Sequence, residues 1–143
     1  MIALAALICA ALFAGAAFYV AFAEHPARMT LDDGAALTQW KPAYARGTIM
    51  QVTLAALGGV LGALAWWRYQ SNIFWLAGGI VLLLNIPYTF AAVWATNKRL
   101  GATAPETAGP ETRALLAKWG RLHLVRVALG LVATLLIARG ILP

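Results

Sequence analysis

The sequence predicts an all-α, polytopic membrane protein, a four-helix transmembrane bundle with a short interfacial helix between helices 1 and 2. Composition is the first observation behind this prediction, because 62 % of the 143 residues are hydrophobic and 11 % are charged. The mean hydropathy of +0.76 is too high for an ordinary soluble domain. The second observation is that apolar stretches of spanning length occupy most of the chain. They leave a single domain, residues 1–143, with no room for a soluble catalytic module.

The first three predicted spans contain no charged residue, and each is long enough for a helix that needs about 20 apolar residues to cross the hydrocarbon layer. They are residues 2–23, 47–67 and about 73–95. The first ends in a sequence that resembles a signal-peptidase site, but it lacks a positively charged start and is longer than a signal-peptide core, so we expect it to remain as helix 1. The single cysteine, Cys9, lies within it, which excludes an internal disulfide or a dithiol redox pair.

The connection between the first two spans, residues 24–46, is long enough to hold structure of its own. Residues 35–44 predict a short helix that is interrupted at Pro42. Apolar and aromatic side chains recur along it at helical spacing and would anchor it at the membrane surface. These are Leu37, Trp40 and Tyr44.

The fourth span can cross the membrane only if it takes a charge with it. Only twelve residues, 127–138, lie between its two arginines, so a span over about 122–142 holds His123 and Arg126 within its first turns. An arginine at mid-membrane costs roughly 2.5 to 3.5 kcal/mol and usually faces a partner, a cavity or a ligand. The alternative is that its side chain snorkels to the nearby headgroups. Pro110 begins a helix that we expect to run unbroken into this span.

Lysines and arginines are distributed unequally between the two ends of the predicted bundle. With four spans both termini lie on one side, and that side carries only Arg68 and Arg139. The other side carries Arg28, Lys41, Arg46, Lys98, Arg99, Arg113, Lys118 and Arg121. The positive-inside rule then predicts a bacterial-type inner membrane protein with both termini outside. The net charge of +6 is therefore a topology signal, and we expect the lipid bilayer, not nucleic acid, as its partner.

Polar residues of the predicted spans converge at the cytoplasmic end. They are Glu24, His25, Thr48, Gln51, Asn97, Trp119, His123 and Arg126. The last three are spaced i, i+4 and i+7, which places them on one helical stripe that we expect to face the bundle interior. A carboxylate, two imidazoles and an arginine at one depth could supply a general base, a proton relay and a cation for a developing oxyanion. The alternatives are structural: an interfacial Glu24–His25 pair, a hydrogen bond from His123 to a backbone carbonyl, and Asn97 as a helix cap.

Two stretches carry a resemblance to a known family. They are Pro87-Tyr88-Thr89 leading to Thr96-Asn97-Lys98-Arg99-Leu100, and Leu116 to Arg126 with its Trp-x-x-x-His-x-x-Arg element. Together with Glu24 and Trp40, they make the chain similar to the anthrone oxygenase-like family of small four-helix membrane proteins. The resemblance covers nearly the whole chain. It implies a membrane oxygenase that oxidises the activated methylene of a lipophilic polycyclic aromatic to a quinone with molecular oxygen.

The residue roles below follow from that resemblance. His123 or His25 would be the base, with Glu24 orienting or relaying, and Arg126 would hold the enolate or phenolate oxygen. Trp40, Tyr88 and Trp119 would sandwich a flat substrate, and Asn97 would contribute to its binding. Deprotonated anthrones react with oxygen directly, so no cofactor is favoured and no metal ligands are assigned.

Other classes of protein remain open on the sequence. His25 and His123 lie on different helices at similar depth and could ligate haem or bind a quinone headgroup in a non-catalytic or electron-transfer subunit. Glu24, His25 and His123 are also suitable metal-ion ligands. A small-molecule transporter ranks third, because small multidrug exporters carry a carboxylate in the middle of helix 1. Here Glu24 stands at the end of helix 1 and the span itself is uncharged. Gly58 and Gly62, in G-x-x-x-G spacing, would pack within the bundle or in a homo-oligomer.

Overall fold

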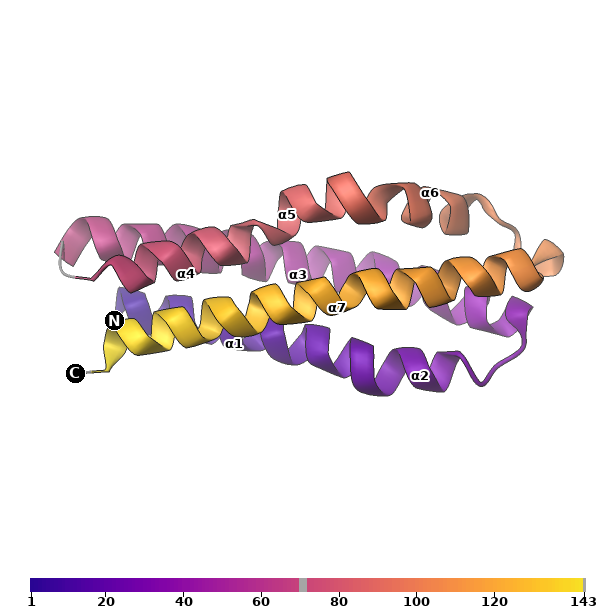
Figure 1. Cartoon of the computed structure of the whole chain (residues 1–143), viewed down its shortest axis with the longest axis horizontal. Coiled ribbons are helices and arrows are strands. Elements are labelled where there is room, and N and C mark those ends of the chain that lie inside the picture. Colours follow the sequence, from indigo (N-terminus) through magenta and orange to yellow (C-terminus); the bar gives the residue numbers. More distant parts are fainter. Residues whose placement is uncertain (70–71, 143) are drawn as a thin grey trace.

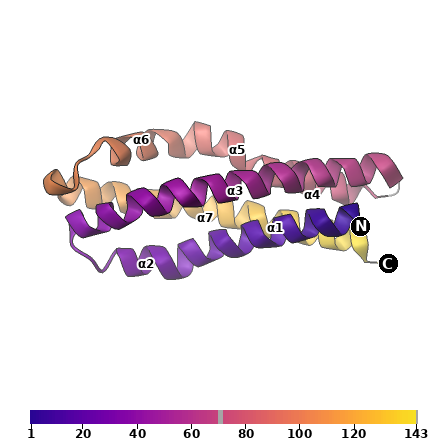
Figure 2. The same cartoon turned by 180° about the vertical axis from the view of Figure 1, so that it is seen from behind.

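The computed structural model describes residues 1–69 and 72–142, and within them the chain is helical with no strand. Four helical segments run along an elongated bundle, seen from its two sides in Figures 1 and 2. The first comprises α1 (Ile2–Tyr19), the π-helical turn η1 (Val20–Glu24) and α2 (His25–Arg28), and the second is α3 (Asp33–Tyr69). The third comprises α4 (Ile73–Leu83), α5 (Asn85–Tyr88), the π-helical turn η2 (Thr89–Val93) and α6 (Trp94–Ala102). After the 3-10 turn η3 (Pro105–Thr107), the fourth is α7 (Pro110–Ile141).

Each segment is long and apolar enough to cross a membrane, with lengths of 27, 37, 30 and 32 residues. The predicted four-helix transmembrane bundle is therefore confirmed, as is the unbroken helix from Pro110. Both termini lie at the same end of the bundle (Figure 1). We call the opposite end, where α2 ends and α3 and α7 begin, the distal end. Around the bundle, α1 and α4 each pack against both α3 and α7.

The prediction of a separate interfacial helix was wrong, because α3 runs from Asp33 through Pro42 to Tyr69 without a break. Pro42 removes one backbone hydrogen bond, but the turns before it are held by buried contacts. Leu37 and Trp40 belong to a distal core that also contains Leu100, Leu116 and Trp119. The first segment likewise continues past Ala23 to Arg28. The connection between the first two segments therefore shrinks to four residues, 29–32.

Glycines bring the helices close together at the end that holds the termini. A Cβ atom on Gly62 would lie 2.7 Å from the backbone oxygen of Trp75 and 3.2 Å from Cα of Gly79. One on Gly58 would lie 2.6 Å from Leu82 Cδ2 and 3.0 Å from Cβ of Cys9. Both glycines of the G-x-x-x-G pair therefore face neighbouring helices of the same chain, where small residues permit close packing in lipid.

The third segment bends at Leu84, between α4 and α5, and its distal half bows away from α3 and α7 (Figure 1). Pro87 lies just beyond the bend and cannot donate a backbone hydrogen bond. Local side chains add two hydrogen bonds there: Asn85 Nδ2 donates to Leu82 O at 3.0 Å, and Thr89 Oγ1 donates to Asn85 O at 2.7 Å. The second carbonyl also accepts from the backbone N–H of Thr89.

Candidate functional site

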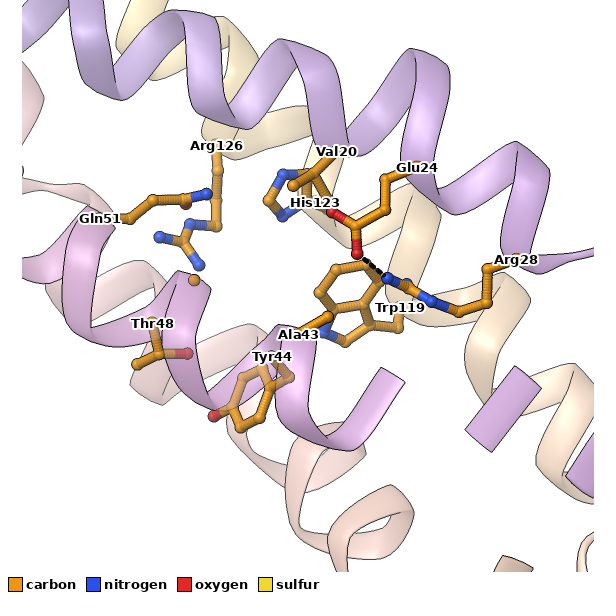
Figure 3. Close-up of a pocket in the computed structure, with 11 residues that line it drawn as sticks. Val20, Glu24, Arg28, Ala43, Tyr44, Thr48, Gln51, Trp119, His123 and Arg126 are labelled. Carbon is orange, nitrogen blue, oxygen red and sulfur yellow. Dashed lines mark hydrogen bonds and ion pairs between the residues drawn. The ribbon is translucent and has the colours of Figure 1, made fainter. Parts of the chain in front are cut away.

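A small cavity of about 30 Å³, lined by polar and aromatic side chains, lies inside the distal half of the bundle. Its walls come from the first segment, α3 and α7 (Figure 3). The lining residues are Val20, Glu24, Arg28, Ala43, Tyr44, Gly47, Thr48, Gln51, Trp119, His123 and Arg126. In the view of Figure 3, Arg126 lies at one end and the Glu24–Arg28 pair at the other, with His123 and Trp119 between them. We call this space the polar pocket.

Arg126 is the cation of the polar pocket that lacks a counter-ion. The residue is only 8 % exposed, and its guanidinium carbon lies 5.7 Å from the ring centroid of Phe13, near the middle of the first uncharged stretch. Its Nε is buried without a hydrogen-bond partner, and no carboxylate pairs with the guanidinium anywhere in residues 1–69 and 72–142. The side chain does not snorkel to the surface but points into the pocket, toward Gln51 and Thr48 (Figure 3). An unpaired cation at this depth is an attractive site for an anionic oxygen.

His123 is fixed between the backbone of α1 and the ring of Trp119. It is 3 % exposed, and its Nε2 lies 3.2 Å from the carbonyl oxygen of Ala17. A carbonyl can only accept, so Nε2 carries the proton of the neutral ring and Nδ1 holds the free lone pair. The ring stacks on Trp119 with a centroid distance of 5.1 Å and an interplanar angle of 19°. The hydrogen bond to a carbonyl is the structural role foreseen for His123, and it also fixes the tautomer that a base at Nδ1 would need.

Arg28 organises the other end of the polar pocket. The side chain is buried, forms an ion pair with Glu24, and donates hydrogen bonds to the Gln39 side-chain oxygen and, at 3.2 Å, to Nδ1 of His25. Gln39 Nε2 also donates to Glu24 at 3.2 Å. Glu24 is therefore occupied by Arg28 and Gln39. Because Glu24 neutralises Arg28, the uncompensated positive charge of the pocket belongs to Arg126.

His25 lies next to the polar pocket rather than on its wall. It is 9 % exposed, and its ring lies 5.4 Å from that of Trp119. Gly120 makes room for it, since a Cβ atom at position 120 would come within 2.4 Å of His25 Nε2. The two imidazoles thus both contact Trp119, one through stacking and one through a tilted contact.

The remaining predicted substrate-binding residues lie around the polar pocket without lining it. Trp40 is 1 % exposed. Its ring stacks on that of Tyr44 with a centroid distance of 4.7 Å and meets that of Trp119 edge-on with a centroid distance of 6.1 Å. Tyr88 donates from its hydroxyl to the carbonyl oxygen of Leu122 at 2.9 Å. Asn97 is 5 % exposed, and its side-chain amide has no hydrogen-bond partner among the residues that the structure describes. Of the predicted site residues, the pocket wall therefore includes Glu24, Trp119, His123 and Arg126.

Sequence reasoning missed Arg28 and Tyr44 as pocket residues. The prediction counted Arg28 as a loop cation, whereas the structure places it at the end of the first helical segment, one turn after Glu24. That i, i+4 spacing to a carboxylate was the available signal. Tyr44 was assigned to the surface anchor, which followed from the mistaken interfacial helix. Gln51 was noted as polar, and the structure places its side-chain oxygen, buried without a partner, on the pocket wall.

Within the described ranges, no group of three or more histidine, cysteine, aspartate or glutamate side chains is placed to hold a metal ion. One ring nitrogen of each histidine also has a local partner. His25 Nδ1 accepts from Arg28, and His123 Nε2 donates to Ala17.

The fold and the site together define a class: a polytopic helical membrane protein with an uncompensated cation in a buried polar pocket. A family profile described as "Anthrone oxygenase" matches residues 40–136, and the chain belongs to this family. The matched range contains Trp119, His123 and Arg126. No curated protein and no solved structure matches the chain significantly.

Proposed function

We propose that this protein is a membrane-embedded oxygenase acting on a lipophilic polycyclic aromatic ketone. Its activated methylene group, as in anthrone, would become a carbonyl group at the expense of molecular oxygen. The observation that carries the proposal is Arg126, a buried guanidinium that points into the polar pocket without a carboxylate partner in the described chain. An enolate oxygen supplies the missing negative charge. Membership of the anthrone oxygenase family supports the same reaction class.

The side chains around Arg126 suit this ligand. Trp119 and Tyr44 give the polar pocket aromatic walls, against which a flat ring system stacks favourably. His123 lines the same pocket with its Nδ1 lone pair free, because Nε2 is engaged by Ala17. A base and an anion-stabilising cation from one helix therefore face one cavity.

The proposed reaction balances with oxygen as the only co-substrate. His123 Nδ1 takes one proton from the methylene carbon, and the charge of the resulting anion rests on the ketone oxygen beside Arg126. The former methylene carbon then gives up an electron pair to O2 and forms a carbon–oxygen bond, and the resulting peroxide takes up a proton. Loss of the second methylene proton with cleavage of the O–O bond gives a carbonyl group and water. Anthrone and O2 thus become anthraquinone and H2O.

The distal end, by this proposal, is cytoplasmic in a bacterial-type inner membrane, with both termini outside. Seven cations flank it: Lys41, Arg46, Lys98, Arg99, Arg113, Lys118 and Arg121. Only Arg68 and Arg139 flank the other end. The test is a G101C variant in a Cys9→Ala background, because position 101 is exposed with open space around it. An impermeant maleimide should label the introduced cysteine of this variant only after the membrane is opened. Labelling of intact cells would show that the protein has the opposite orientation.

The activity is tested with the full-length protein in nanodiscs, supplied with anthrone in air-saturated buffer. We expect oxygen consumption above that of empty nanodiscs, with one anthraquinone formed per O2. His123→Gln should lower the rate at least tenfold, whereas Lys118→Gln, an exposed change on the same helix, should leave it unaltered. A wild-type rate equal to the empty nanodiscs, or full activity in His123→Gln, would refute the proposal.

A further inference from the structure

A second cavity, of about 80 Å³, adjoins the polar pocket where the third segment bows away from α3. The two cavities share Tyr44, Thr48, Gln51 and Arg126 as lining residues. The rest of the second cavity is predominantly apolar, and it reaches α5 and η2. We call it the lateral cavity.

The mouth of the lateral cavity lies on the surface that faces lipid. Val52 on α3 is 42 % exposed, and Phe90 and Trp94 across from it are 64 % and 50 % exposed. All three fall within uncharged stretches that span the membrane, so their exposed surfaces meet acyl chains and not water. At its inner end the cavity is walled by Phe13, which is fully buried. The cavity therefore runs from the lipid to the guanidinium of Arg126.

Three polar groups in the lateral cavity lack hydrogen-bond partners among the described residues, although each of the three residues is at least nine-tenths buried. They are Gln51 Oε1, Asn85 Oδ1 and Arg126 Nε. Buried polar atoms are nearly always hydrogen-bonded in a working protein, so a ligand that meets this set must both accept from a cation and donate to amide oxygens. A phenolic ring system with a neighbouring ketone or phenolate oxygen does both. A fatty-acid carboxylate accepts but has no hydrogen to donate.

We infer that the lateral cavity holds one outer ring of the ligand of this protein and is the route by which the ligand enters from the bilayer. A flat, hydroxyl-bearing aromatic ligand enters between Val52 and Phe90 with one outer ring first. Its middle ring stops beside Arg126, the leading ring reaches Trp119 in the polar pocket, and the trailing ring stays in the lateral cavity. This inference takes the chemical class of the ligand from the proposed function and rests on it in that respect. It adds the position of the trailing ring and an entrance from the lipid, neither of which the reaction itself requires.

The test uses 1,8-dihydroxyanthraquinone, a flat probe that no longer has a methylene group to oxidise. The wild type and variants, in nanodiscs, are titrated with the probe, and binding is followed by the circular dichroism that a chiral site induces in the visible band of the probe. Val52→Trp fills the mouth and should weaken binding at least tenfold. Val60→Trp places the same ring two turns further along the same helix, at a residue that is 53 % exposed and lies outside both cavities, and should bind as the wild type does.

A second variant opens the mouth instead of closing it. Phe90→Ala removes an exposed ring and should speed association of probe delivered from preloaded vesicles at least threefold. If Val52→Trp and Val60→Trp bind alike and Phe90→Ala associates at the wild-type rate, the inference is wrong while the proposed function stands. If the wild type itself does not bind the probe, both are refuted. Displacement of the probe by an equal concentration of decanoate would identify an acyl chain as the occupant and would also overturn the inference.

Discussion

Replacement of Arg126 by methionine should move stability and ligand binding in opposite directions. The guanidinium is buried beside Phe13 with an unpartnered Nε and no carboxylate in the described chain, so no ion pair offsets the cost of its desolvation. Methionine keeps most of the aliphatic stem and removes the charge. Because an arginine at mid-membrane costs roughly 2.5 to 3.5 kcal/mol, we expect the variant to be more stable by about 1 to 3 kcal/mol.

Binding should weaken for the same reason that stability increases. A hydrogen bond to a charged group contributes about 1.5 to 3 kcal/mol, which corresponds to a loss of about 10- to 150-fold in affinity for 1,8-dihydroxyanthraquinone. Affinity is measured by probe titration, and stability by unfolding in mixed micelles of increasing SDS content. Arg121→Met, an exposed change on the same helix, is the control and should alter neither quantity by more than about 0.5 kcal/mol. An Arg126→Met variant that is destabilised yet binds the probe normally would show that the arginine supports the scaffold and not the ligand.

Two further predictions concern glycines. Gly62→Ala should destabilise the protein by about 1 to 3 kcal/mol in the same unfolding assay, since its Cβ would meet the backbone oxygen of Trp75 at 2.7 Å. Gly47→Ala, with nothing within 4 Å, should instead stabilise the helix by up to about 1 kcal/mol, and equal effects at both positions would refute the packing argument. Gly120→Ala should displace the His25 ring, 2.4 Å from the new Cβ, and cost about 1 to 2 kcal/mol. Adding His25→Ala should recover part of that loss, and strictly additive effects would show that the two residues do not interact.

The sequence was informative about the spans and about the helical stripe of α7. A charge inside an otherwise apolar stretch is costly, and the stripe of Trp119, His123 and Arg126 had to face inward for that reason. The structure buries all three, with exposures of 6, 3 and 8 %. Periodicity along one helix sufficed because the argument needed no partner from another helix.

The sequence was less informative about where helices end and about contacts between segments. Hydropathy records which residues lie in lipid, so it ended the first helix at Ala23 and could not show that the helix continues to Arg28. The burial of Arg28 depends on Gln39, eleven residues away across a connection, and no local pattern predicts that contact. The lateral cavity was also unforeseen, because it arises from the bend at Leu84, and the size of such a bend is set by packing against α3 and α7.

The central claim is that Arg126 and His123 act together to take a proton from a bound lipophilic methylene. Hydrogen exchange tests it without oxygen: anthrone in nanodiscs is placed in D2O under argon, and loss of its methylene proton signal is followed by NMR. We predict exchange at least tenfold faster with the wild type than with empty nanodiscs, and exchange at the rate of empty nanodiscs with either Arg126→Met or His123→Gln. Wild-type exchange no faster than in empty nanodiscs, or acceleration that survives both substitutions, would contradict the account.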